Sequence, residues 1–82
     1  MSAYALNKML REINQNPATR QGYFERPETI AERFVLSEEE RGAFLTQDIG
    51  ALYRLGVHGL ILRPFTLLKQ MPEADYLRAI RE

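Results

Sequence analysis

Residues 52–68, LYRLGVHGLILRPFTLL, form the most apolar stretch of the chain and contain its only histidine, His58. Apolar residues at helical spacing line both sides of one predicted helix here: Val57, Leu60, Ile61, Phe65 and Leu68 on one side, and Leu62, Leu67 and Met71 on the other. A helix that is apolar on almost every side has to be buried on more than one face. The other parts of the chain are therefore expected to pack around this segment.

Pro64 lies inside this predicted helix and has no N–H with which to continue the helical hydrogen bonding. The helix is expected either to kink at Pro64 or to stop near Leu62 and restart. Gly56 comes just before the helix and suits the left-handed residue that commonly follows a helix end. The stretch is therefore expected to hold the end of one helix and most of the next.

Composition predicts one domain that covers residues 1–82, since 45% hydrophobic and 27% charged residues are typical of soluble globular chains. A domain of 82 residues has a thin core, so its apolar surface is expected to find a partner. The 11 basic and 11 acidic residues are interspersed, and the absence of a basic stripe argues against nucleic-acid binding.

The chain has no cysteine, which excludes disulfides and thiolate metal sites and fits a reducing compartment. Its first residues lack the basic head and apolar run of a signal peptide, and no run of about 18 apolar residues could span a membrane. A cytoplasmic protein without a membrane segment is therefore expected.

Local signals divide the rest of the chain into short helices. The first helix is predicted between a Ser2 cap and Asn16. Pro17 and Pro27 each suit the first position of a further helix, and the helix that starts at Pro27 should reach Phe34. The first helix is expected to bury four residues at helical spacing: Leu6, Met9, Leu10 and Ile13.

Capping residues predict two more helix starts. Ser37 and Glu40 form a capping-box pattern, and Thr46 is expected to cap the helix that ends at Gly56. A last helix should follow Pro72. In the short helices, the side chains expected to face the core of the domain are, helix by helix, Ala18, Tyr23 and Phe24; Ile30, Ala31 and Phe34; Ala43, Phe44 and Leu45; Ile49, Leu52 and Tyr53; and Ala74, Leu77 and Ile80. The predicted fold is all-α, a single compact domain of about six short helices.

Few residues offer chemistry. His58 is the one side chain whose ordinary titration lies near neutral pH, and it is expected to sit at a helix start, satisfied by a backbone group. The alternative is that Gly56 and Gly59 allow a ligand or another backbone to approach it closely. Glu38, Glu39 and Glu40 would point about 100° apart on a helix and cannot converge on one ion. We therefore predict no catalytic residue and no metal site in this chain.

Three segments of the chain follow one another in a distinctive order: Asn16-Pro17 with Phe24, residues 34–45 (FVLSEEERGAFL), and residues 48–58 (DIGALYRLGVH). Together they resemble the LigA-type small (alpha) subunit of the protocatechuate 4,5-dioxygenase family, the LigAB or type II extradiol dioxygenases. The resemblance extends from about residue 6 to residue 70. It implies a helical subunit with a capped helix, a helix that ends in glycine, and a glycine-led apolar helix.

In that family a larger beta subunit binds non-haem iron(II) through two histidines and a carboxylate, and the alpha subunit covers the mouth of the active site. The resemblance thus implies a non-catalytic chain that docks on an extradiol dioxygenase and caps its active site for catecholic aromatic compounds. No cofactor is expected in this chain, and Fe(II) is expected in the partner subunit.

The resemblance also suggests which residues face the substrate. A Gly-Gly-Asn-Ile-Tyr-like segment of the family falls on residues 56–60, with His58 in place of the asparagine and Leu60 in place of the tyrosine. The expected lid residues are Gly56, Val57, His58, Gly59 and Leu60. The expected partner interface consists of Ile61, Leu62, Phe65 and Leu68.

An alternative function is a stand-alone helical docking or protein-interaction module, because similar domains also occur alone and in precursor peptides that modifying enzymes recognise. The sequence has no Gly/Ser-rich tail after Glu82 that a modifying enzyme could act on, which disfavours the precursor. In a stand-alone module, self-association through the apolar residues 57–71 would replace the larger subunit.

Overall fold

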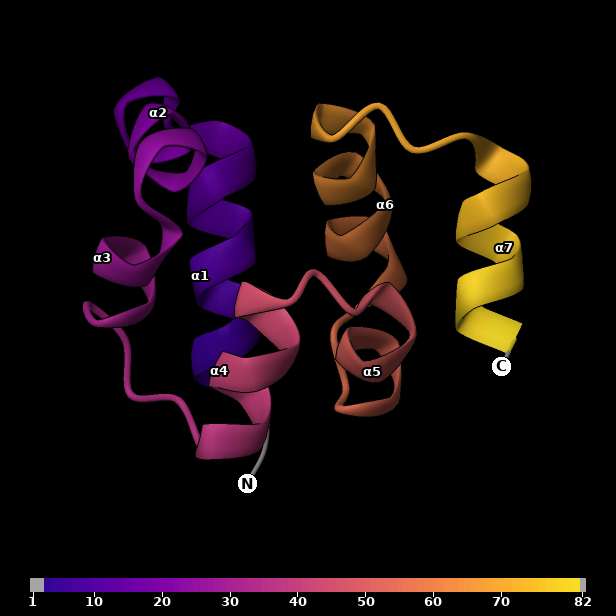
Figure 1. Ribbon diagram of the computed structural model, residues 1–82, viewed down its shortest axis with the longest axis horizontal. Coiled ribbons are helices and arrows are strands. Elements are labelled where there is room, and N and C mark those ends of the chain that lie inside the picture. The colour runs from indigo at the N-terminus through magenta and orange to yellow at the C-terminus, as the bar shows by residue number, and fades with distance from the viewer. Residues whose placement is uncertain (1–2, 82) are drawn as a thin grey trace.

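Seven helices, and no strand, are found among residues 3–81, the part of the chain that the computed structural model describes. They are α1 (Tyr4–Gln15), α2 (Pro17–Glu25), α3 (Pro27–Ala31), α4 (Glu38–Leu45), α5 (Ile49–Arg54), α6 (Gly59–Leu68) and α7 (Glu73–Arg81) (Figure 1). The all-α fold is therefore confirmed, with seven helices where about six were predicted. The cap predicted at Ser2 lies outside the described residues, and Ala3 holds the N-cap position of α1.

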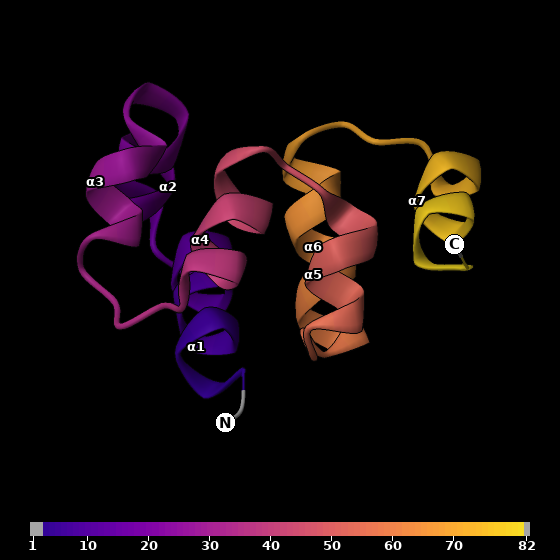
Figure 2. The same cartoon turned by 60° about the horizontal axis from the view of Figure 1, so that its bottom comes forward.

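Helices α1 and α6 stand side by side in the middle of the molecule, although more than 40 residues separate them in the sequence (Figure 1). Helices α2 and α3 lie beyond α1, and α4 leads from them to α5. In the turned view α5 lies in front of α6, against which it packs (Figure 2). Helix α7 lies at the far end of the molecule and packs mainly on α5. The apolar segment thus occupies the centre, as predicted.

The four residues predicted for the inner face of α1 are all fully buried, which confirms that face: Leu6, Met9, Leu10 and Ile13. Tyr23 of α2 then connects three helices. The centroid of its ring lies 5.4 Å from that of Phe44 in α4 and 5.4 Å from that of Phe65 in α6. Aromatic pairs at this spacing contribute attraction beyond the area that they bury.

The capping box at the start of α4 is present as predicted. The Glu40 amide donates to Ser37 Oγ at 3.0 Å, and the Ser37 amide donates to Glu40 Oε1 at 2.9 Å. The cap predicted at Thr46 is wrong, because Asp48 caps α5 by accepting from the Ala51 amide at 3.1 Å. Gln47 adopts a left-handed conformation with φ of 60° between Thr46, the C-cap residue of α4, and Asp48, the N-cap residue of α5.

In the short helices, some side chains predicted to face the core are exposed, although others, such as Ile49 and Leu52, are buried as predicted. Ala18 and Ala74 are exposed, as are Phe24 and Tyr53, at 53% and 43%. In α2, Tyr23 is buried as predicted, together with Thr19, which was not predicted. In α7 the buried residue is Tyr76, and the predicted Leu77 and Ile80 are half-buried. The reason is that a helix of six to nine residues makes only two turns, so neighbouring contacts decide its orientation rather than its own periodicity. Helix α3 also ends at Ala31, before Phe34.

Helix α6 begins at Gly59 and continues through Pro64 without a break, so of the two alternatives expected at Pro64 the split near Leu62 does not occur. Proline leaves the carbonyl four residues earlier, that of Leu60, without its helical donor. Leu60 lies in the exposed first turn, where water can take the place of that donor. In addition, Thr66 Oγ1 donates to the Arg63 carbonyl at 2.8 Å, just before the proline.

Candidate functional site

His58 is the N-cap residue of α6. Its Nδ1 accepts a hydrogen bond from the Leu60 amide at 3.1 Å, and its own amide donates to Asn7 Oδ1 at 2.8 Å. The expectation of a helix-start histidine satisfied by a backbone group is therefore confirmed. A ring that accepts at Nδ1 is neutral and carries its proton on Nε2. Nε2 makes no hydrogen bond within residues 3–81, and the side chain is exposed.

Two asparagines of α1 hold the start of α6. Asn7 Nδ2 donates to the Gly56 carbonyl at 3.1 Å, and Asn14 Nδ2 donates to the Ile61 carbonyl at 3.0 Å. Seven residues make two helical turns, so both side chains lie on the same side of α1. Sequence reasoning missed this contact, and its only local signal is the spacing of the two asparagines.

The two glycines that flank His58 differ in what they require. Gly56 has a φ of +112°, a conformation that other residues rarely adopt, and a Cβ there would lie 3.3 Å from Ala3 Cβ. It is the left-handed residue predicted after α5. A Cβ on Gly59 would meet nothing within 4 Å, so no contact within the described residues calls for a glycine at that position.

The residues predicted to face a substrate or partner fall into two groups. Val57, Leu62 and Phe65 are buried in the chain's own core, which places these side chains out of reach of a partner in this conformation. Ile61 and Leu68 are half-buried. The most exposed apolar side chains of α6 are Leu60 at 82% and Leu67 at 55%. Leu67 was not among the predicted interface residues, because a helix that is apolar all round does not reveal which side the core takes.

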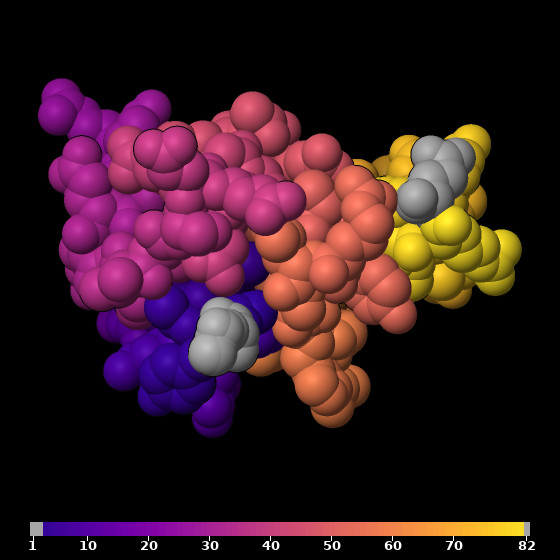
Figure 3. Space-filling model, turned by 90° about the horizontal axis from the view of Figure 1, so that it is seen from below, coloured from indigo at the N-terminus to yellow at the C-terminus, as the bar shows by residue number. Residues whose placement is uncertain are grey.

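A groove runs between α1 and α6 and consists of two adjoining hollows. The larger holds about 450 Å³ and is lined by Arg11, Asn14, Gln15, His58, Leu60, Ile61 and Pro64. The smaller holds about 210 Å³ and is lined by Tyr4, Asn7, Lys8, Arg11 and Ile61. The two share Arg11 and Ile61, and we call them together the α1–α6 groove. Seen from below, the start of α1 (indigo) and of α6 (orange) are separated by a notch (Figure 3).

Among the described residues, the α1–α6 groove is lined by two cations, Lys8 and Arg11, and by no carboxylate. Lys8 and Arg11 are both exposed, and the one ion pair among residues 3–81 joins Arg78 and Asp75 elsewhere. His58 adds a polar but neutral ring at the same place. The groove is thus a local positive patch on a chain whose net charge is zero.

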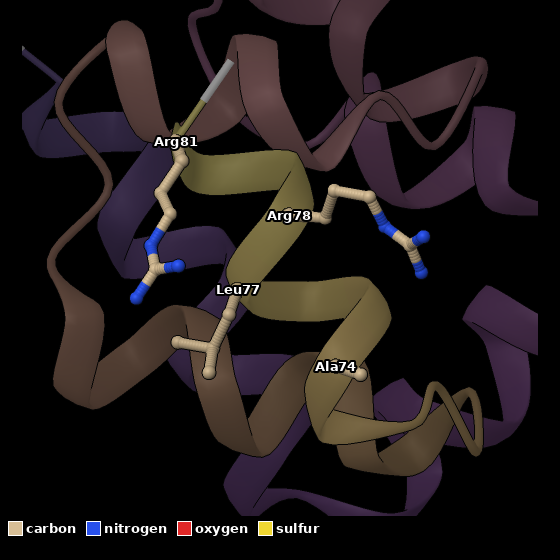
Figure 4. Close-up of a pocket in the computed structure, with 4 residues that line it drawn as sticks. All are labelled: Ala74, Leu77, Arg78 and Arg81. Atoms are coloured by element: carbon tan, nitrogen blue, oxygen red, sulfur yellow. The ribbon is translucent and has the colours of Figure 1, made fainter.

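A third hollow lies on α7 and is lined by that helix alone, through Ala74, Leu77, Arg78 and Arg81. Leu77 and Arg81 extend to one side of the helix, and Arg78 extends to the other (Figure 4). Because Arg78 is paired with Asp75 and a single helix supplies every wall, this hollow is a shallow feature of the surface rather than a built site.

Lys69 and Tyr23 form a second polar contact, away from the α1–α6 groove. Lys69 Nζ donates to Tyr23 Oη at 3.3 Å and lies 5.8 and 5.9 Å from the centroids of the Tyr23 and Phe65 rings. It also donates to Gln47 Oε1. Burial raises the pKa of Tyr23 to about 12 and lowers the pKa of Lys69. These contacts tie the end of α6 to α2 and α4 and give the pair a structural role.

No three histidine, cysteine, aspartate or glutamate side chains come together among residues 3–81 in a way that could hold a metal ion. The only histidine also uses Nδ1 to cap a helix. The described residues therefore offer no set of ligands that fits a metal ion. In the same part of the chain, no helix is both long and apolar enough to cross a membrane.

No curated protein and no solved structure matches the chain. A family model does match it, over residues 6–80, and the description of that family is the LigA subunit of the aromatic-ring-opening dioxygenase LigAB. The match covers nearly all of the 82 residues, including all of helix α6 and nearly all of α1. The chain therefore belongs to the LigA family of small subunits of aromatic-ring-opening dioxygenases.

Proposed function

We propose that this chain is a non-catalytic small subunit that docks on the larger subunit of an aromatic-ring-opening dioxygenase and covers the mouth of its active site. The observation that carries the proposal is the family match over residues 6–80. The larger subunit would be an extradiol enzyme that holds iron(II) through two histidines and a carboxylate. Its substrates would be catecholic aromatic compounds.

In this proposal the first turn of α6 is the part of the chain that faces the substrate. His58 presents Nε2–H outward, because Nδ1 is already used as the helix cap. A neutral imidazole N–H can donate to an anionic or hydroxyl oxygen of an aromatic substrate. Leu60, at 82% exposure, would pack on the larger subunit beside this ring and so close the rim of the pocket. This chain would thus orient the substrate and exclude water, while oxygen chemistry stays with the larger subunit.

The α1 asparagines support this role because they fix the position of the lid segment. Asn7 binds the backbone on both sides of Val57, at the Gly56 carbonyl and the His58 amide. A lid residue held by backbone hydrogen bonds needs less ordering when the substrate arrives. The His58 ring would therefore be pre-positioned before the two subunits meet.

The proposal is tested by mixing this chain with a candidate larger subunit that carries two histidines and a carboxylate, such as one encoded beside it. The chain alone should show no ring cleavage, and the mixture should form a complex on a sizing column. Ring-opening of a catecholic substrate should be faster in the mixture than with the larger subunit alone. Absence of both the complex and the rate increase would exclude the proposed role.

The alternative function, a stand-alone module that self-associates through residues 57–71, predicts a different oligomeric state for the purified chain. A stand-alone docking module should form a dimer at micromolar concentration in the absence of any partner, with Leu60 and Leu67 covered in it. Sedimentation analysis of the purified chain separates the two functions, because the small-subunit proposal expects a monomer until the larger subunit is added.

A further inference from the structure

The exposed apolar residues of α6 lie on one line. Leu60, Pro64 and Leu67 are four and three residues apart, which places them on the same side of the helix, and all three are exposed. The opposite side, with Leu62 and Phe65, is fully buried. An unpartnered apolar line on a helix that also forms the centre of the core marks a surface that another molecule can cover.

Helix α1 presents a second line beside the first. Tyr4, Lys8, Arg11 and Gln15 follow the helical spacing and are all exposed. Asn7 binds the backbone at Gly56 and Asn14 binds it at Ile61, so the two helices run in the same direction. The α1 line therefore borders the α1–α6 groove on one side, and Leu60 and Pro64 border it on the other, with Leu67 continuing the α6 line beyond the groove. From Tyr4 to Gln15 the helical rise gives about 16 Å, or roughly three turns.

Exposed apolar side chains also gather at the groove and next to it, since Tyr4 and Leu60 line it and Leu67 lies further along α6. Among residues 3–81 six large apolar residues are exposed, and three of them lie on α1 and α6: Tyr4, Leu60 and Leu67. The other three are scattered over α2, the segment before α4, and α5: Phe24, Val35 and Tyr53. Charge distinguishes the groove further, since its described lining contains the cations Lys8 and Arg11 and no carboxylate.

We infer that the α1–α6 groove is the docking surface for an amphipathic helix of the larger subunit that carries carboxylates along one flank. This identification of the partner rests on the proposed function. The apolar side of that helix covers Leu60 and Leu67, and its acidic flank lies along Lys8 and Arg11. A helix fits because the described residues present no sheet edge to which a strand could add, and a groove between two helices receives a third.

Each part of this surface has a different effect on binding. Exposed cations at the rim of an interface add little to affinity one by one, but they steer association and set orientation. The apolar line supplies most of the affinity, because burying it removes carbon surface from water. Reversing the two charges should therefore lower the association rate in a salt-dependent way, and shortening the leucines should raise the dissociation rate.

The first experiment measures binding kinetics between this chain and the candidate larger subunit of the mixing experiment. The double variant K8E/R11E should bind about tenfold more weakly at low salt, mostly through slower association. The matched control R26E/R33E makes the same change in net charge on exposed residues of the α2–α3 side and should bind like the unmodified chain. The double variant L60S/L67S should dissociate faster, while V35S at the most exposed valine should not.

A second experiment needs no larger subunit. The probe is a synthetic amphipathic helical peptide with a leucine stripe and a glutamate flank, and its control has lysine in place of each glutamate. In amide NMR spectra the glutamate peptide should shift signals of α1 and α6, with about tenfold tighter binding than the lysine peptide. K8E/R11E should remove that preference, and circular dichroism should show all variants folded.

The outcomes separate this inference from the proposed function. If the larger subunit binds and K8E/R11E and L60S/L67S behave like their controls, the docking surface is wrong and the function stands. If no larger subunit binds but the glutamate peptide occupies the groove, the function is wrong and the surface stands. Equal binding of both peptides, shifts on other helices, or a dimer of this chain that covers Leu60 would each overturn the surface.

Discussion

Helices α5 and α7 meet at Gly50, and this contact gives a sharp test of the packing. A Cβ added to Gly50 would lie 2.7 Å from the backbone oxygen of Ala79 and 3.2 Å from Arg54 Nη1. The arginine end is flexible and can move. The Ala79 carbonyl belongs to α7 and can move only with the helix. Restoring an ordinary contact of 3.4 Å would need a shift of roughly 0.7 Å.

The variant Gly50→Ala should therefore destabilise the fold, and two opposing effects set its size. If α7 moves away from α5 by roughly 0.5–1 Å, each dispersion contact between the two helices loses about a quarter to a half of its energy. Overpacking of this kind typically costs about 1–3 kcal/mol. Replacing glycine by alanine in a helix returns at most about 1 kcal/mol, and less here because residue 50 is the second residue of α5. We expect a net loss of about 1–2 kcal/mol.

Gly42→Ala is the matched control, because a Cβ on Gly42 would meet nothing within 4 Å and the residue lies in the middle of α4. This variant should gain about 0.5–1 kcal/mol. Urea denaturation measures both free energies of unfolding. Hydrogen exchange should in addition be faster in α7 of Gly50→Ala, since α7 packs mainly on α5. A Gly50→Ala variant as stable as Gly42→Ala, with α7 still protected, would refute this packing.

Three further predictions concern single side chains. His58→Ala should lose the α6 cap and about 0.5–2 kcal/mol in urea denaturation, whereas His58→Asn should keep most of it; equal losses would show that the cap is unimportant. Asn7→Asp keeps the acceptor for the His58 amide but replaces the donor to Gly56 by a charge, and should cost about 1–3 kcal/mol in the same assay; an unchanged value would contradict the contact. Burial raises the pKa of Tyr23 from 10.0 to about 12, so the folded state keeps its proton when the unfolded state has lost it. Below pH 10 this difference in pKa makes its full contribution to the free energy of unfolding, which should fall by about 2–3 kcal/mol as pH rises through 12. The lowered pKa of Lys69 acts in the opposite direction, and Tyr23→Phe should remove the alkaline loss; a variant with the same loss would contradict its assignment to Tyr23.

The longest helix and the strongest local signals could be predicted from the sequence. Twelve residues of α1 hold enough turns for periodicity to identify the buried face correctly. The capping box at Ser37 and the left-handed Gly56 are local devices, each complete within a few residues. Such features do not depend on which other helix comes near, and the structure confirms all three.

The features that could not be predicted depend on distant parts of the chain. Asn7 and Asn14 bind carbonyls 49 and 47 residues away, and no local pattern reveals such pairs. Phe24 was predicted to face the core but is exposed, and the buried Tyr76 was not predicted. Their helices are too short to fix their own orientation. In α6 the apolar pattern is nearly continuous, so sequence alone could not separate buried Phe65 from exposed Leu67.

Ring-opening activity as a function of subunit ratio tests the central claim most directly. A fixed amount of the larger iron-containing subunit is titrated with this chain, and cleavage of a catecholic substrate is followed by absorbance. The account predicts that the rate rises with each addition and saturates at a fixed molar ratio, while this chain alone has no activity. A rate that stays at the level of the larger subunit alone, with no complex formed, would contradict the assignment of this chain as its small subunit.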